Sequence, residues 1–458
     1  MSTLQIGLRQ RYLEHYPGNS RRIWYLALAV IATIMLYYES YVLPSVAPLV
    51  LASFHLEVST YTRILLLSNI IGAISAIFGS LSDRIGRSNL IVYGLLLTGL
   101  GTIAISFTGA SIIAFLVFIC VLGFIEGVIL VATPALVRDF SPRFGRALAM
   151  GFWTVGPVGG SVLATLAANQ TLPIYGSWQS QYVIAGIVGI VVFVLCFLFL
   201  RELSPGLRDQ VMNSLREKDE IERRAAGINI EKAMEHPWRQ MLHPRLLISA
   251  FGISVYLLIY YAAVGFFPLY LSSIFKFTVA QADGLVGIFW LVNVAAAILI
   301  GFISDRALVR KPFMLVGSLA TIVVTLLFMS RIGTPTDGGL MALFLSLFGV
   351  SIAIGYVTWM AAYTETVEDI NPALVATGLA VEGFILRTVV VLSTLSFSFV
   401  VTNQLDGSQW ATWWWVCIAG LVVFIPTIFV ASGYWTAART RAAVLQSEES
   451  QELGIETV

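Results

Sequence analysis

Charged residues are scarce in this 458-residue chain, in which 12% of the residues are Asp, Glu, Lys or Arg and 58% are apolar. A soluble protein is nearer a quarter charged, because polar groups must cover its surface. The net charge of +1 also argues against the strongly basic face that nucleic-acid binding requires. With a mean hydropathy of +0.85, the composition predicts a multi-spanning membrane protein in a lipid bilayer.

Cysteine and histidine are also few, with three and four copies. Each cysteine stands alone in an apolar run, which predicts neither a disulfide framework nor a metal cluster. The histidines lie in polar segments or at their edges, so the sequence offers no zinc ligand set and no Cys/His nucleophile pair. We therefore expect no metal, no cofactor and no enzymatic active site.

Long apolar runs are what the chain has in abundance. Runs of about 20 residues predict transmembrane helices, because backbone groups in hydrocarbon must be satisfied within a helix. None of them alternates as a membrane-barrel strand does, so no strand is expected. The twelve predicted spans are 23–52, 61–82, 88–108, 111–137, 146–169, 181–200, 246–274, 281–303, 312–331, 340–363, 373–401 and 412–435.

One long polar segment divides the spans into two groups of six. Short loops on one side carry nearly all of the Lys and Arg residues, so the positive-inside rule places both termini and the polar segment in the cytoplasm. The predicted organisation is a cytoplasmic segment 1–22, a six-helix bundle 23–201, a linker 202–245, a second six-helix bundle 246–435 and a cytoplasmic tail 436–458.

An internal repeat relates the two halves. Residues 79–87 read GSLSDRIGR between the second and third spans, and residues 301–310 read GFISDRALVR between the eighth and ninth. The two aspartates, Asp83 and Asp305, are 222 residues apart and occupy equivalent places. A six-span unit repeated in the same orientation predicts two parallel repeats, with a substrate site near the membrane midplane between them.

The motif GSLSDRIGR resembles the signature loop of the major facilitator superfamily of secondary transporters, and its degenerate second copy matches as well. The resemblance covers nearly the whole chain and implies an all-α membrane protein with twelve helices in two six-helix repeats. It implies a protein of the plasma membrane, or inner membrane in bacteria, that acts as a monomer on a small-molecule substrate. It does not identify that substrate, since one fold hosts many functions.

The same resemblance implies a cytoplasmic gate, in which Asp83 and Asp305 hold that side closed. Its other residues are Gly79, Arg84, Gly86, Arg87 and Arg306. From the residues alone, Gly86 permits a tight turn, and Asp83 can pair with Arg84 or Arg87 or face a helix amino terminus. The alternative is that the loop only anchors the topology through its positive charge.

The fifth span carries GFWTVGPVGG, residues 151–160, which resembles a glycine-rich motif often associated with proton antiporters. Small residues at such positions also allow helices to pack closely, and we favour that interpretation. The fourth span departs from the family pattern, because Ile119 stands where many members have an arginine four residues before the glycine matched by Gly123. This argues against a mechanism that depends on that arginine.

Ionisable residues near the middle of a span are expensive, at roughly 2.5–3.5 kcal/mol each on insertion scales. Glu39, Glu126 and Arg387 lie there, and Glu382 lies about five residues from Arg387 on a different helix face. The resemblance places the first, fourth and eleventh spans beside the central cavity. Arg387 then predicts a site for an anion, and Glu39, Glu126 and Glu382 are the proton-carrier candidates. The alternative is a structural ion pair, such as Glu126 with Arg387.

Aromatic and polar side chains in the same spans are candidates for lining the substrate site, although each one alone is more typical of helix packing. The predicted lining residues are Tyr38, Tyr256, Tyr260, Trp290, Asn293 and Trp359, together with Arg387. An aromatic-lined cavity that holds an arginine suits an organic acid.

Three functions follow from these features. The first is a carrier that takes up a small organic anion together with protons. The second is a proton antiporter that exports drugs or amphipathic metabolites, which the glycine motif and the aromatic content favour and Ile119 disfavours. A membrane-embedded enzyme or sensor is the third, and no catalytic residue set supports it.

Overall fold

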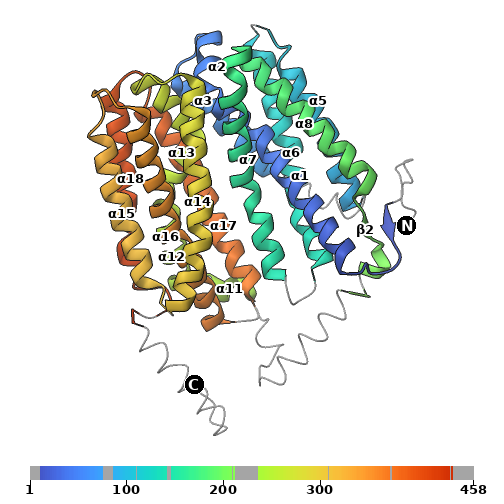
Figure 1. Cartoon of the computed structure of the whole chain (residues 1–458). Coiled ribbons are helices and arrows are strands. Elements are labelled where there is room, and N and C mark those ends of the chain that lie inside the picture. The colour runs from blue at the N-terminus through green and yellow to red at the C-terminus, as the bar shows by residue number, and fades with distance from the viewer. Residues whose placement is uncertain are drawn as a thin grey trace. The chain divides into compact units, whose positions relative to one another are not determined.

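The computed structural model describes residues 11–75, 86–109, 111–141, 146–208, 210–211, 236–307, 309–371, 374–433 and 435–436, and these fold almost wholly into helices (Figure 1). The helices of the first part are α1 (Asn19–Ser45), α2 (Ala47–Phe54), α3 (Val58–Ser75), α5 (Arg87–Ile105), α6 (Ile112–Phe140), α7 (Arg146–Tyr175) and α8 (Trp178–Phe199). The helices of the second part are α11 (Pro237–Met241), α12 (Pro244–Tyr256), α13 (Leu258–Ile274), α14 (Val279–Ala307), α15 (Lys311–Met329), α16 (Gly338–Ile370), α17 (Val375–Val400) and α18 (Gly407–Thr427).

Within the described residues the predicted spans correspond to these helices, and the end of the second span, 76–82, lies outside them. Within the described ranges, 11 helical segments are long and apolar enough to cross a membrane, with α12 and α13 counted as one. The remaining predicted span, 146–169, is covered by α7. The prediction of an all-α membrane fold is confirmed.

Two predicted spans are interrupted rather than continuous. The first breaks at Val46, between α1 and α2, where Pro48 has no N–H to donate to the carbonyl of Pro44 one turn earlier. The second breaks at Leu257, between α12 and α13. Hydropathy did not show either break, because the residues on both sides are equally apolar.

The expectation of no strand is wrong at one place. Strand β1 (Tyr12–Leu13) pairs in parallel with β2 (Glu202–Leu203). The N–H of Glu202 donates to the carbonyl of Arg11 at 3.1 Å, and the N–H of Ser204 donates to that of Leu13 at 3.0 Å. A two-residue ladder of this kind needs no alternating pattern, so nothing in the sequence predicted it.

The chain divides into two compact units. Unit 1 comprises residues 1–226, 266–287 and 402–404, and unit 2 comprises residues 227–265, 288–401 and 405–458. The end of α13 and the start of α14 therefore belong to unit 1, and the remainder of each helix belongs to unit 2. The predicted boundary at the linker 202–245 stays a prediction, because most of that segment lies outside the described residues.

In unit 1, α1 packs along α7 and α8, and α5 packs along α8 and α6. The fifth-span glycines lie at the first of these contacts. A Cβ at Gly156 would come within 2.5 Å of Thr33 Cγ2, and one at Gly160 within 2.5 Å of Tyr37 Cβ. This close approach supports the packing interpretation of the motif. In unit 2, α15 packs on α16, and α12 packs on α17 and α18.

Candidate functional site

Glu126 lies on α6, and its side chain is buried inside unit 1 with 8% of the residue exposed. The hydroxyl of Ser40, on α1, donates to Oε2 of Glu126 at 2.5 Å. No cationic side chain pairs with this carboxyl within the described part of the chain. A buried carboxylate held by one neutral donor has a large desolvation penalty, so burial favours its protonated form.

Glu39 precedes Ser40 on α1 and is more deeply buried, at 3% exposure. Its carboxyl reaches α8 at Gly189, where an added Cβ would come within 2.2 Å of Oε1. The hydroxyl of Thr98 lies beside the carboxyl but donates to the carbonyl of Leu95 at 3.3 Å, and neither Glu39 oxygen has a hydrogen bond within the described residues. Glu39 and Glu126 interact electrostatically, and no ion pair of the described residues includes either of them.

Arg387 and Glu382 lie on α17 in unit 2. Arg387 is exposed, and in the described structure it has no hydrogen bond or ion pair. Glu382 is buried, with Oε1 unbonded, and it interacts electrostatically with Tyr356 and Tyr363 of α16. Glu382 and Arg387 interact electrostatically but form no ion pair, in agreement with their predicted placement on different helix faces.

Tyr256 and Trp359 are fully buried in unit 2 and have hydrogen-bond partners there. The hydroxyl of Tyr256 lies 3.1 Å from the carbonyl oxygen of Ile352 and 3.2 Å from that of Ser351, both on α16. The indole Nε1 of Trp359 donates to Ser249 Oγ at 2.9 Å. These contacts fit helix packing, and the proposed substrate roles of both residues stay predictions.

Trp290 and Asn293 share α14. Trp290 is 1% exposed and meets the ring of Tyr260 edge-on at 5.2 Å between centroids. Asn293 Nδ2 donates to the carbonyl of Gly349 at 2.9 Å, which fastens α14 to α16. In unit 1, Tyr38 is 4% exposed on α1. Only Tyr260 of the predicted aromatic lining keeps a partly exposed side chain.

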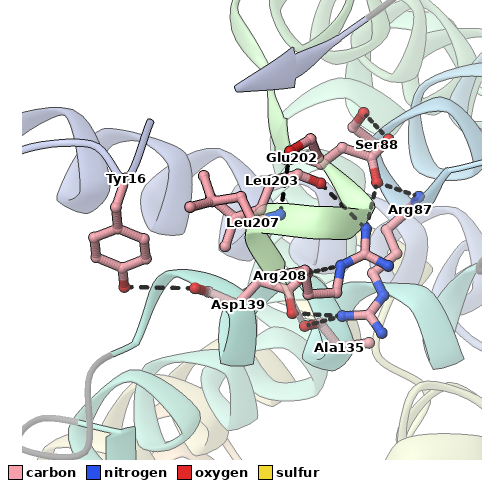
Figure 2. Close-up of polar contacts among 10 residues, drawn as sticks. Tyr16, Arg87, Ser88, Ala135, Asp139, Glu202, Leu203, Leu207 and Arg208 are labelled. Carbon is pink, nitrogen blue, oxygen red and sulfur yellow. Dashed lines mark hydrogen bonds and ion pairs between the residues drawn. The ribbon is translucent and has the colours of Figure 1, made fainter. Parts of the chain in front are cut away.

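Four side chains, which we call the unit 1 charge cluster, meet where α5 begins and α6 and α8 end: Arg87, Asp139, Glu202 and Arg208. Arg87 NH1 lies 2.6 Å from Asp139 Oδ1, and Arg208 bridges Asp139 at 3.4 Å and Glu202 at 3.3 Å (Figure 2). Both carboxylate side chains are fully buried. Of these four residues, only Arg87 was predicted as functional. Asp139, at the end of the fourth span, and Glu202, the first acid after the sixth, were missed because their partners are distant in sequence.

Glu202 caps the amino terminus of α5. Its Oε2 accepts from the N–H of Arg87 and its Oε1 from the hydroxyl of Ser88, each at 2.8 Å. Burial raises the pKa of Glu202, and these hydrogen bonds together with Arg208 lower it by less. Gly86 has φ +99°, and an added Cβ would come within 2.4 Å of Glu202 Oε1. The predicted tight turn at Gly86 is present, and it also makes room for the capping carboxylate.

Arg11 closes the same end of unit 1 and is 1% exposed. Its Nε donates to Asn89 Oδ1 at 3.0 Å, and NH1 donates to the carbonyl of Phe197 at 2.6 Å, near the end of α8. A cation at a helix carboxyl terminus satisfies carbonyls that have no partner in the helix and stabilises the helix dipole. Residues 11–13 are therefore bound to the rest of unit 1 by strand β1 and by Arg11.

The second copy of the loop motif forms the unit 2 charge cluster, consisting of Asp305, Arg310 and Glu365. Arg310 lies 2.6 Å from Asp305 Oδ1 and 3.2 Å from Glu365 Oε1 of α16. Arg306 lies over the ring of Phe302, at 4.2 Å from its centroid. The remaining predicted gate residues, Gly79, Asp83 and Arg84, lie outside the described residues, so the gate stays a prediction.

Long apolar helices with few buried carboxyl groups define an integral multi-pass membrane protein. The sequence model of the Major Facilitator Superfamily matches residues 29–392, which is most of the chain. The chain belongs to this superfamily, as the loop motif predicted. It is a transporter and not an enzyme.

Solved structures share the fold. A bacterial homologue of the human lysosomal transporter Spinster, in an inward-facing and occupied conformation, superposes with a TM-score of 0.66 at 17% identity, over 90% of this chain and 97% of that one. The xylose transporter XylE from E. coli gives a TM-score of 0.64 at 16% identity, over 90% and 98%. At these identities the likeness concerns the fold.

A partial sequence match points to a different kind of relative. The quinolone resistance protein NorB of Staphylococcus aureus (strain JH9) is 24% identical over 190 residues, which are 40% of this chain and 38% of that protein. The match thus spans well under half of either chain.

Proposed function

We propose that the protein is a proton-coupled carrier of a small organic anion that works by alternating access. The observation that carries this proposal is the buried Glu126 carboxyl, which has one hydroxyl donor and, among the described residues, no cationic partner. When the site is closed, this carboxyl holds a proton, because an ionised form there has lost its hydration without gaining a counter-ion. When the site opens to water, the carboxyl can release that proton.

Arg387 supplies the anion site in this proposal. An exposed arginine in the middle of a span faces water or protein rather than lipid, because hydrocarbon cannot solvate a guanidinium. Arginine stays charged at every physiological pH and presents a planar fork that binds a carboxylate through two hydrogen bonds. A carboxylate metabolite, including an aromatic one, fits this chemistry.

The remaining predicted roles belong to the same proposal. Glu39 and Glu382 are further protonatable groups, and Asp83 and Asp305 form the cytoplasmic gate. The carrier acts as a monomer in the plasma membrane, with both termini in the cytoplasm.

Uptake of labelled carboxylates into proteoliposomes, under an imposed proton gradient of either sign, tests the proposal. We expect Arg387→Ala to abolish binding while the protein still inserts, and Arg387→Lys to weaken binding because lysine lacks the fork. Glu126→Gln imitates the protonated carboxyl, so exchange should persist while gradient-driven accumulation is lost.

The ion-pair alternative predicts the opposite. If Glu126 and Arg387 only neutralise each other, each single substitution should destabilise the protein by about 3–5 kcal/mol. The double variant Glu126→Gln/Arg387→Gln would then recover both stability and transport. Recovery of transport in that variant would remove Arg387 from the substrate site.

A second candidate, a proton antiporter that exports drugs or amphipathic metabolites, is favoured by the partial match to NorB. The fifth-span glycines favour it less, since their contacts with α1 have a packing explanation. The direction of the imposed proton gradient distinguishes the two candidates. An antiporter accumulates a cationic dye under a proton gradient whose direction drives no carboxylate uptake.

A further inference from the structure

The beginning of α14 is fastened to the first helices of the chain inside unit 1. Ser45, the last residue of α1, donates through its hydroxyl to Asp283 Oδ1 at 2.7 Å. Asn169 Nδ2, on α7, donates to the carbonyl of Ala280 at 2.7 Å. Gly284 lies against the same asparagine, so that an added Cβ would come within 2.4 Å of Nδ2. The predicted orientation places this end of the helices on the extracellular side.

Asp283 is a buried ionisable group whose lost hydration is offset by very few hydrogen bonds. It is 0% exposed, Oδ1 receives the single bond from Ser45, and Oδ2 has no hydrogen bond within the described residues. The proposed transport mechanism does not use Asp283. A carboxylate in this setting is strongly disfavoured relative to the neutral acid, which keeps the Ser45 bond at Oδ1.

The surroundings of Asp283 provide no counter-charge. From α7, the residues that face this part of α14 are Asn169 and Thr165, and both are neutral. Tyr61 of α3 packs edge-on against Phe266 of α13. On the segment that leads into α14, Lys276 Nζ donates to the carbonyl of Ser273 at 2.7 Å. In the described structure, no ion pair joins Asp283 to a cationic side chain.

We propose that Asp283 is a proton-binding site that controls the extracellular closure of unit 1. With the proton bound, Asp283 stays against Ser45, and the start of α14 remains packed on α1 and α7. When this end separates, water reaches the carboxyl, which gives its proton to the external solution and is then stabilised by hydration. A deprotonated Asp283 opposes closure until it takes up a proton again, so external pH sets the balance between the closed and open forms.

This site is distinct from the proton carrier assigned above, because Glu126 lies on α6 and bonds to Ser40. It also requires no particular substrate. Closure at Asp283 can therefore be measured without transport, and the result does not depend on whether the organic-anion proposal holds.

The test uses the full chain in intact cells, with Cys120, Cys196 and Cys417 replaced by serine and one reporter introduced by Thr165→Cys. Thr165 is 5% exposed and faces Gly287 of α14, so the reporter reacts with a membrane-impermeant maleimide only when α7 and α14 separate. The control reporter is Lys276→Cys. Lys276 is exposed, so this reporter measures how the labelling chemistry itself depends on pH.

We expect the labelling rate, divided by that of the control reporter, to rise about tenfold or more between pH 5 and pH 8, since an ionised fraction changes about tenfold per pH unit below the midpoint. Asp283→Asn should hold the rate at the slow, low-pH value at every pH. A flat rate in the parent protein, or an unchanged pH dependence in Asp283→Asn, overturns the proposal.

Two further variants keep the test decisive if Asp283→Asn does not fold. Asp283→Glu retains a titratable carboxyl, so the rate must still depend on pH, with a displaced midpoint. Ser45→Ala removes the hydroxyl donor and should raise the low-pH rate several-fold without removing the pH dependence. Loss of pH dependence in Asp283→Glu contradicts the proposal.

Discussion

The two charge clusters derive from the same repeated loop motif but differ in their surroundings. In unit 1, Arg87 pairs with Asp139, which is fully buried. In unit 2, Arg310 pairs with Glu365 and Asp305, whose side chains are 39% and 67% exposed. Each cluster joins an arginine of the motif to an acid on a later helix. The two repeats therefore share this ion pair but differ in how deeply the acid is buried.

The difference arises from segments that lie outside the repeated motif. Glu202 of β2 joins the unit 1 cluster through Arg208 and also caps α5, and Arg11, just before β1, donates to Asn89 of α5. Removing one member of a buried charge network lowers the free energy of unfolding much more than removing one member of a solvated network. The reason is that the charge left behind in the buried network has lost its hydration and has no partner. We therefore expect the two copies of the motif to contribute unequally to the free energy of unfolding.

The largest expected effect comes from truncating Asp139, the acid that Arg87 and Arg208 share in the unit 1 cluster. Asp139→Ala leaves Arg87 and Arg208 partly buried without their shared counter-charge, and it should lower the free energy of unfolding by about 3–5 kcal/mol. The matched variant Glu365→Ala should cost about 0–1 kcal/mol, because Glu365 is 39% exposed and water screens its ion pair with Arg310. Thermal unfolding of the purified protein in detergent measures both. Equal losses would mean that burial does not distinguish the clusters.

Gly86→Ala should have the next largest effect. The positive φ of Gly86 costs an alanine about 1–3 kcal/mol, and its Cβ would also displace the capping carboxylate of Glu202. Gly333→Ala is the control, since Gly333 has φ +80° and nothing within 4 Å of an added Cβ. The excess destabilisation of Gly86→Ala over Gly333→Ala reports the contact with Glu202. If there is no excess, the capping contact is dispensable.

Glu202→Gln should change the pH dependence of stability. Because burial raises the pKa of Glu202 in the folded protein, the folded state binds the proton more tightly than the unfolded state does. The stability from this proton is fully present below the ordinary value of 4.5 and is lost as the pH rises through the folded pKa. The unfolding temperature of the parent should fall relative to that of Glu202→Gln as the pH rises from 4.5. Parallel curves would contradict this.

Asp305→Asn should have the smallest effect, at about 0–1 kcal/mol, because its pairing with Arg310 is largely solvated. Whatever stabilisation exists should disappear in high salt. Cysteine labelling from the cytoplasmic side should change only slightly. A large loss of stability in low salt would show that the unit 2 cluster is as important as the unit 1 cluster.

Some candidate site residues could be predicted from the sequence and others could not. Glu39, Glu126, Glu382 and Arg387 were proposed because an ionisable residue is conspicuous within an apolar run, and their roles stay predictions. Asp283 was missed because it falls near the start of its span, where acids are common. Asp139 and Glu202 were missed because the contacts that bury them join residues 52 and 115 positions from the partner.

The sequence by itself determined the class of protein, the placement of the spans and the superfamily, because hydropathy and a short motif are local properties of the chain. The positive φ at Gly86 also follows from a local glycine in a turn. Only the tertiary structure decided which charges are buried, which helix breaks occur at Val46 and Leu257, and which carboxyls lack a counter-charge. Those properties depend on the free energy of desolvation, which is set by neighbours from distant parts of the chain.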